Sequence, residues 1–282
     1  MSMRKLSEQA ARLCLFAFFA VVVASFFVDI PYWWGWVPLG LWLLLAFGVN
    51  RRAARAAAKS AAGAVPEAVE VAAPVTGRWK ALNSPADKVP SHGTRAYGQA
   101  YAIDIVAEPE PGARPGFGWW PLVRRNEDFP AFGAPLLAVA DATVVRTDDR
   151  QRDHLSRTSW PAAIYMLVIE GAVRVMGGAR RVVGNHVILD LGDGTYALYA
   201  HVRRGSLTVR TGDRVRAGQP LGQCGDSGNS SEPHVHFQLM DGEDLETAAG
   251  VPFTWRGIGV PANGELFDAA APAETPAETP AG

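Results

Sequence analysis

An apolar run near the N-terminus places the strongest constraint on how this chain can fold. From Leu13 to Val49, 30 of 37 residues are hydrophobic, and Asp29 is the only charged residue. A single helix of that length would measure about 55 Å, well beyond the roughly 30 Å hydrocarbon core of a bilayer. The run therefore predicts two short transmembrane helices, at about 12–28 and 33–49, joined by a turn at Asp29-Ile30-Pro31.

The flanks of this run bear on its topology. Trp33, Trp34 and Trp36 follow the turn, where interfacial aromatic residues are common. One tilted span with an amphipathic lead-in, or an uncleaved signal anchor, also fits the run. Residues 1–60 carry seven Lys or Arg against two acids, whereas residues 61–282 carry 20 against 26. By the positive-inside rule, both flanks and the domain that follows are expected on the cytoplasmic side.

Composition divides the whole chain into four parts. We expect a membrane anchor over 1–52, an Ala/Pro linker over 53–75, a folded domain over 76–268 and a disordered tail over 269–282. The net charge of −1 argues against a nucleic-acid-binding protein. The two cysteines, Cys14 and Cys224, are too few for a disulfide framework or a four-thiolate zinc site.

The folded domain shows short strand patterns separated by glycine turns, which predict a mostly β fold. Strands are expected at 101–106, 135–146, 185–190, 196–201, 206–210, 219–223 and 234–240. The turn Gly192-Asp193-Gly194 predicts a hairpin. Residues 160–176 are apolar enough to form either a helix or a buried strand. The expected architecture is a β-sandwich or barrel-sandwich of the duplicated hybrid type.

Histidine and aspartate in strand patterns point to a metal site. His234 and His236 alternate within a strand pattern, so both imidazoles lie on one face. His201 ends another strand pattern, and Asp104 lies between Ile103 and Ile105. A carboxylate in such apolar surroundings is costly to bury unless it is paired or bound to a metal. Imidazoles and a carboxylate suit Zn²⁺.

The sequence motifs around these residues resemble those of a known family. They are Gly184-Asn185-His186-Val187-Ile188-Leu189-Asp190, a glycine hairpin over 209–222 (VRTGDRVRAGQPLG), and a closing GDSGNSSEPHVHF over 225–237. This pattern closely resembles the lysostaphin-like, or LytM-type, zinc metallopeptidases, which include glycyl-glycine endopeptidases. The segment FGAPLLAVAD over 132–141 also resembles a strand of that family. The resemblance covers about residues 100–240.

The resemblance implies a set of roles. His236 and Asp104 would be zinc ligands, and His201 and His234 would orient the attacking water and stabilise the oxyanion. The reaction implied is hydrolysis of an amide bond in a peptidoglycan peptide. One position departs from the pattern, because the family's first histidine ligand corresponds to Ala100. His92 in a nearby loop, the amide oxygen of Gln99, or a degenerate site with little zinc are the alternatives.

Two rival functions remain to be weighed. A catalytically degenerate relative could bind and regulate cell-wall hydrolases, and the alanine at position 100 favours it. A biotinyl or lipoyl carrier could share the hairpin at 212–219, but no lysine follows Lys88 to accept the group. The segment between Val145 and Gly184 is long for the family, and we expect a lid or groove wall there. His186, His154 and Cys224 are expected to be structural or solvated, and Trp119 and Trp120 to pack or to line a cleft.

Topology conflicts with this function. A cell-wall hydrolase requires its domain outside the membrane, whereas the flanking charges predict the inside. The expected partners are a peptidoglycan or other peptide, the membrane, and a cell-wall hydrolase if the domain is regulatory.

Overall fold

The computed structural model describes residues 3–25, 27–28, 31–45 and 67–270. The chain separates into two compact units. The first comprises Met1–Glu67 and Ile164–Val182, and we call it the helical unit. The second comprises Ala68–Ala163 and Val183–Gly282, and we call it the sheet unit. Predictions for 46–66 and 271–282, which include most of the linker and the tail, lie outside the described residues.

The helical unit contains the 22-residue helix α1 and several shorter helical elements. Its elements are α1 (Met3–Ala24), η1 (Tyr32–Gly35), a helical stretch at 36–45, the π-helical turn η4 (Met166–Glu170), α4 (Gly171–Met176) and most of α5 (Ala179–Val183). Helix α1 contacts both η1 and α4. Among the described residues, no helix is long and apolar enough to cross a membrane. The first predicted span differs from α1, which starts at Met3 among charged residues and stops at Ala24.

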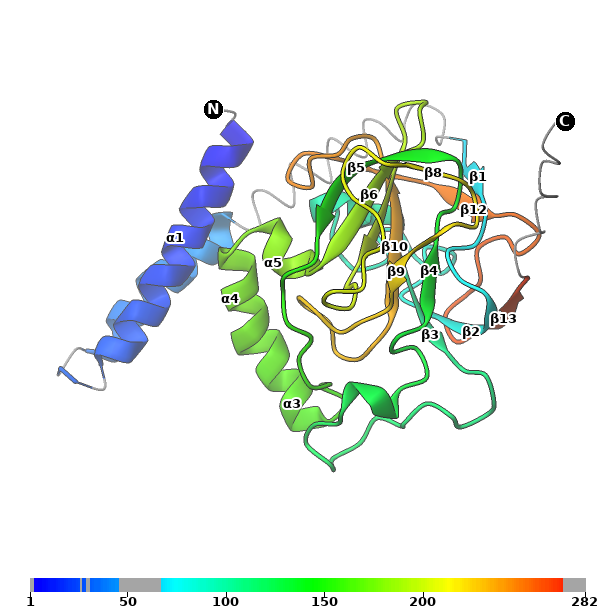
Figure 1. Cartoon of the computed structure of the whole chain (residues 1–282). Coiled ribbons are helices and arrows are strands. Elements are labelled where there is room, and N and C mark those ends of the chain that lie inside the picture. The colour runs from blue at the N-terminus through cyan, green and yellow to red at the C-terminus, as the bar shows by residue number, and fades with distance from the viewer. Residues whose placement is uncertain (1–2, 26, 29–30, 46–66, 271–282) are drawn as a thin grey trace, which may run out of the picture. The chain divides into compact units, whose positions relative to one another are not determined.

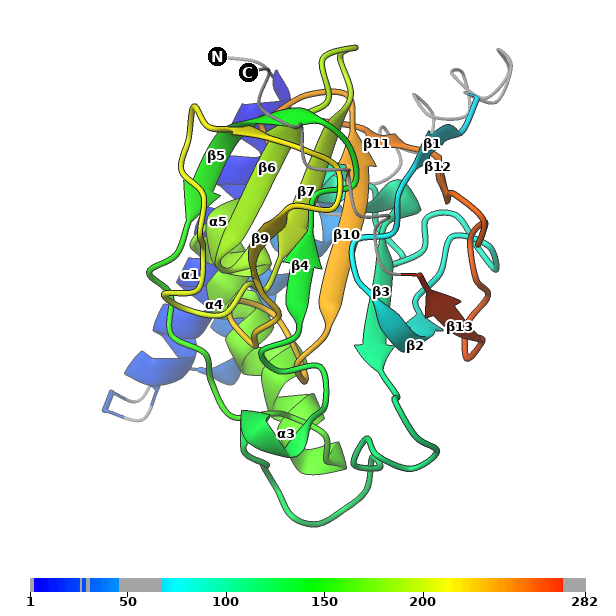
Figure 2. The same cartoon turned by 45° about the vertical axis from the view of Figure 1, so that its right-hand side comes forward.

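The sheet unit is built on a nine-stranded antiparallel sheet (Figures 1 and 2). Its strands in spatial order are β13 (Leu266–Ala269), β2 (Gly77–Leu82), β3 (Ile103–Ala107), β10 (Val235–Met240), β7 (Tyr196–Ala200), β6 (His186–Asp190), β5 (Ala142–Asp148) and β8 (Arg214–Val215), with β11 (Gly250–Val251) beside β10. The order shows that β10, late in the sequence, lies between β3 and β7 at the centre of the sheet. The mostly β prediction is therefore confirmed.

A second layer covers one face of this sheet. Strands β4 (Pro135–Leu137) and β9 (Pro220–Gln223) form an antiparallel pair, and Figure 2 shows it across the large sheet. The buried core between the layers includes Tyr199, Phe237 and Leu221. The Tyr199 hydroxyl donates to the Leu137 carbonyl at 2.8 Å and accepts from the Val139 amide at 3.0 Å. Apolar packing and these bonds join the layers.

Short elements complete the sheet unit. They are β1 (Val69–Val71), which pairs in parallel with β12 (Phe253–Trp255), the 3₁₀ turns η2 (Ala96–Tyr101) and η3 (Asn126–Asp128), and α3 (Trp160–Tyr165), whose last two residues belong to the helical unit. The segment expected as a linker at 53–75 thus ends in a paired strand at Val69–Val71.

Several strand predictions hold and others need correction. The predicted strands at 101–106, 185–190, 196–201, 219–223 and 234–240 correspond to β3, β6, β7, β9 and β10. The one at 135–146 is split, because the chain turns between Leu137 and Ala142. The strand predicted at 206–210 is absent from the described sheet, since Thr208 bonds to Leu221 but its neighbours do not extend the ladder. Residues 160–176 are helical, not a strand.

Candidate metal centre

Strand register brings His236 and Asp104 together. In the pairing of β10 with β3, His236 lies directly opposite Asp104. His236 Nδ1 is 2.8 Å from Asp104 Oδ1, and both side chains are buried. Their neighbours Phe237 and Ile103 point into the core, because side chains alternate along each strand. The same alternation that builds the core thus sends an imidazole and a carboxylate to the opposite face.

His92 reaches the same carboxylate from the loop between β2 and η2. Its Nε2 atom lies 2.9 Å from Asp104 Oδ2, and Asn83 Nδ2 donates to that oxygen at 2.8 Å. The rings of His92 and His236 meet edge to face with their centroids 4.9 Å apart. His92, Asp104 and His236 therefore form one group whose potential ligand atoms all lie within 4.8 Å of one another.

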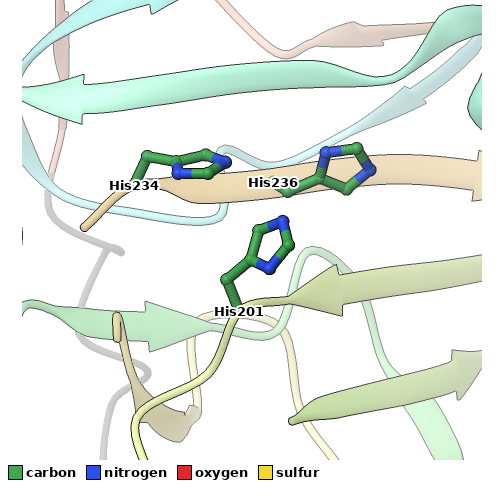
Figure 3. A group of neighbouring side chains, drawn as sticks. All are labelled: His201, His234 and His236. Carbon is green, nitrogen blue, oxygen red and sulfur yellow. The ribbon is translucent and has the colours of Figure 1, made fainter. Parts of the chain in front are cut away.

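His201 and His234 stand beside this group. His201 follows β7 and His234 precedes β10, and their ring centroids are 4.8 Å apart. Figure 3 shows His234 and His236 along β10 and the His201 ring reaching toward them. The potential ligand atoms of His201, His234 and His236 also all lie within 4.8 Å of one another, so these three histidines form a second group. His201 adopts a left-handed φ of 58°, an uncommon backbone conformation that aims its ring at the pair.

Backbone carbonyls set the orientation of two of the rings. His201 Nδ1 lies 2.8 Å from the Ser227 carbonyl, and His234 Nδ1 lies 2.8 Å from the Glu232 carbonyl. A carbonyl oxygen can only accept, so Nδ1 carries the proton in each ring. Each histidine therefore presents Nε2 to the site, and His234 Nε2 is 3.5 Å from Asp104 Oδ1.

His236 is oriented in the opposite sense. Its Nε2 atom is 3.0 Å from Gln238 Oε1, and Gln238 Nε2 donates to the Tyr97 carbonyl at 2.7 Å. The amide nitrogen of Gln238 is thereby engaged, so its oxygen accepts from His236 Nε2–H. His236 Nδ1 then faces Asp104 Oδ1, where it can donate to the carboxylate when it carries a proton and can offer its lone pair to a metal ion when it does not.

The charges of the site are strongly coupled. Burial would raise the pKa of Asp104, but the positive charges of His92 and His234 and hydrogen bonds from His234 and His236 hold that pKa well below its usual value. Burial lowers the pKa of His201, and the neighbouring charges of His234 and His236 lower it further. Burial also opposes the charged form of His234, yet the Asp104 carboxylate outweighs it and raises the pKa of His234 to about 9. The metal-free site thus keeps an ionised carboxylate among imidazoles of unequal basicity.

The donor set suits zinc. In a tetrahedral site with bonds of 2.0–2.2 Å, ligand atoms lie about 3.3 Å from one another. His236 Nδ1 is 2.8 Å from Asp104 Oδ1 and His92 Nε2 is 2.9 Å from Asp104 Oδ2, so each imidazole lies near that separation from one oxygen of the carboxylate. Two imidazole nitrogens and one carboxylate oxygen also leave a fourth position open, as catalytic zinc sites require. The residues present therefore fit the ion.

The other sequence candidates lie outside both groups. Ala100 is buried and offers no ligand atom. The backbone carbonyl of Gln99 accepts a hydrogen bond from the Ser91 hydroxyl at 3.3 Å. His186 is fully buried, with Nδ1 2.8 Å from the Gly184 carbonyl. His154 was expected to be solvated, but it bonds to the Gly228 carbonyl and lies 3.5 Å from Asp226. Cys224 is a buried core residue, and burial raises the pKa of its thiol. Trp119 and Trp120 are exposed.

The sequence did not point to the residues that orient the side chains of the site. Gln238, Asn83 and Ser227 orient the site residues, but none carries a motif that marks it as functional. For Gln238 a usable signal exists, since it continues the alternation of His234 and His236 along one strand face.

Part of this chain is similar in sequence to known peptidases. Residues 166–247 match the model of peptidase family M23. A stretch of 58 residues is 43% identical to the glycyl-glycine endopeptidase ALE-1 of Staphylococcus capitis, covering 20% of this chain and 16% of that protein. It is 41% identical over 58 residues to lysostaphin of Staphylococcus simulans, covering 20% of this chain and 11% of that protein. This chain thus matches less than a fifth of each curated relative.

Among solved structures, the catalytic domain of Staphylococcus simulans lysostaphin is 24% identical, with a TM-score of 0.28 and coverage of 48% of this chain and 85% of that one. Three of the five candidate site residues, His201, His234 and His236, lie within the family match. Residues 166–247 are thus similar in sequence to peptidase family M23, and the 58-residue stretch is similar to lysostaphin-like peptidases.

Proposed function

We propose that this protein is a zinc-dependent endopeptidase that hydrolyses amide bonds in peptidoglycan peptides. The observation that carries the proposal is the convergence of His92, Asp104 and His236 beside two further histidines whose Nε2 atoms face the same point. The name of one relative, a glycyl-glycine endopeptidase, supports a glycine-containing peptide as the substrate.

His92, Asp104 and His236 would hold the zinc ion. When bound, zinc supplies a nucleophilic water at neutral pH and polarises the carbonyl of the scissile amide. His201 Nε2 can accept the proton released by the attacking water, because its Nδ1 is already engaged with Ser227. His234 Nε2 can hydrogen-bond the carbonyl oxygen as negative charge develops on it. His92 thus replaces the ligand that Ala100 does not supply.

A set of histidine variants tests the ligand assignment. Zinc in the purified full chain is measured by elemental analysis, and hydrolysis of a pentaglycine peptide is followed by release of amine. His92→Ala is expected to lose zinc and activity together, whereas His234→Ala keeps zinc and loses activity. The opposite pattern would assign the ion to His201, His234 and His236. His154→Ala, outside both groups, is the control and should retain zinc.

A second function has one observation in its favour, the alanine at position 100. A degenerate relative would act as a regulatory binding module for cell-wall hydrolases. Wild-type protein that binds no zinc under saturating conditions, while stimulating such a hydrolase, would support this role and exclude the peptidase.

The cellular location follows from the substrate. The apolar N-terminal run would attach the chain to the cell membrane, and a peptidoglycan substrate requires the sheet unit outside it. The basic residues on both flanks favour the inside. A C-terminal alkaline phosphatase fusion, active only outside the membrane, distinguishes the two. An active fusion supports the proposed location, and an inactive but intact fusion contradicts it.

A further inference from the structure

The insertion that separates β5 from β6 has an inverted distribution of polarity. Its helical residues Leu167, Ile164 and Val173 are 75%, 59% and 54% exposed. Its only charged residues between 164 and 176, Glu170 and Arg174, pair with each other at 3.3 Å, and their side chains are only 17% and 16% exposed. A helix on a water-soluble surface shows the reverse pattern, with charges outward and apolar residues inward.

The apolar exposure continues along the whole segment. Exposed apolar residues occur in the end of α3, in η4 and in α4. They are Ile164, Tyr165, Leu167, Val168, Ile169, Val173 and Val175. Glu170 and Arg174, four residues apart, pair with each other and are largely covered. Exposed apolar surface of this extent marks an interaction site, and in this case the charges are paired and turned away from it.

The neighbours of the segment indicate what covers it. It belongs to the same compact unit as the N-terminal apolar run, and α4 contacts α1 directly. That run also exposes large apolar residues, among them Phe16, Phe27, Trp36 and Leu44. We propose that residues 164–176 insert their apolar face into one leaflet of a lipid bilayer, beside the N-terminal segment. The chain would then contact the membrane at two places that are more than a hundred residues apart in sequence.

The C-terminal end of the insertion is hydrogen-bonded to a residue of the candidate site. It ends at Val183, whose carbonyl accepts a hydrogen bond from the His201 amide at 2.9 Å. The seven residues from Met176 to Val183 can span at most about 25 Å. A bilayer that holds residues 164–176 therefore lies within about that distance of Val183. If the proposed peptidase function also holds, which this consequence requires, its substrates are peptides that lie close to a membrane surface.

Site-specific fluorescence quenching tests the insertion. In the full chain with Cys14→Ser, the variants Leu167→Cys and Val173→Cys are labelled separately with an environment-sensitive fluorophore. The labelled proteins are reconstituted into vesicles of phosphatidylcholine and phosphatidylglycerol, with or without a lipid that carries a nitroxide near the top of its acyl chain. Ala217→Cys, at an exposed turn of the sheet unit, is the matched control. Circular dichroism confirms that each variant is folded.

The proposal predicts a loss of fluorescence in nitroxide vesicles at both insertion positions and not at the control. Equal fluorescence with and without nitroxide at Leu167→Cys and Val173→Cys would overturn it. An efficient disulfide between two copies of Leu167→Cys without quenching would also overturn it, by assigning the face to a second copy. Zinc content and peptide hydrolysis are measured on the same samples. Quenching without hydrolysis would reject the peptidase proposal alone, and hydrolysis without quenching would reject the insertion alone.

Discussion

Gln238 Oε1 lies 3.0 Å from His236 Nε2, two residues earlier on the same strand. The glutamine is itself held by the Tyr97 carbonyl, at 2.7 Å from its Nε2. Gly98 makes this approach possible, because a Cβ there would lie 2.8 Å from Gln238 Nε2. The turn that follows the His92 loop thus supports the ring of His236 through Gln238.

Gln238→Met is expected to weaken zinc binding. The substitution keeps the volume of the side chain but removes the acceptor that fixes the proton on His236 Nε2. Loss of such a supporting bond typically costs about 10–100-fold in metal affinity. Competition with a chelator measures the change. Gln219→Met, which loses a bond to the Arg216 amide in a distant turn, should leave affinity unchanged. Equal affinities for the wild type and Gln238→Met would show that the ring needs no such support.

The predictability of this site differs from residue to residue. Asp104, His201, His234 and His236 could be identified because their residue types are unusual within strand patterns, and strand pairing then brings them together. His92 could only be one of several alternatives, since a loop and not a periodic element carries it.

The secondary structure was also predictable in some segments and not in others. Alternation predicted the central strands β7 and β10, which are buried along almost their whole length. It also predicted a strand at 206–210, where the Thr208 amide and the Ser206 hydroxyl bond to β9 without forming a ladder. The helical state of 160–176 could not be chosen from its sequence, because an apolar run that lacks a clear period fits a buried strand equally well.

Gly184→Ala is expected to disturb both stability and the site. Gly184 has a φ of +69°, and a Cβ there would lie 2.6 Å from the carbonyl carbon and oxygen of Ser227. That oxygen accepts the bond that orients His201. The left-handed backbone alone costs alanine about 1–2 kcal/mol. Gly192→Ala is the matched control, with a φ of +91° and no atom within 4 Å of the added Cβ. Urea denaturation should show a larger loss for Gly184→Ala, and only this variant should lose hydrolysis. Equal losses in the two variants would indicate that Ser227 moves without consequence.

Tyr199→Phe is expected to weaken the junction between the two layers of the sheet unit. The buried hydroxyl bonds both to the Leu137 carbonyl and to the Val139 amide, and its removal leaves both without that partner. An unsatisfied buried polar group costs about 1–3 kcal/mol. The free energy of unfolding should fall by about this amount. Tyr196→Phe, at the other end of β7 and partly exposed, should change it by less than about 0.5 kcal/mol. A comparable loss in both variants would contradict a specific role for the Tyr199 hydroxyl.

Asp226→Asn is expected to stabilise the protein at pH 8 and to have little effect at pH 4. Burial raises the pKa of Asp226 to about 6, against a partial opposing effect of His154, which lies 3.5 Å away. The native state therefore binds a proton more tightly than the unfolded chain, whose aspartate pKa is about 3.9. Below pH 4 both states are protonated and the group contributes nothing. As pH rises from about 4 to 6 the unfolded state ionises first, so stability falls, by about 2–3 kcal/mol in total. Asparagine removes this loss because it cannot ionise.

Urea denaturation of the wild type and Asp226→Asn between pH 4 and pH 8 measures the difference in the free energy of unfolding, with the exposed Asp213→Asn as control. A stability difference that does not grow between pH 4 and pH 6 would show that Asp226 is ionised in the native state at no cost.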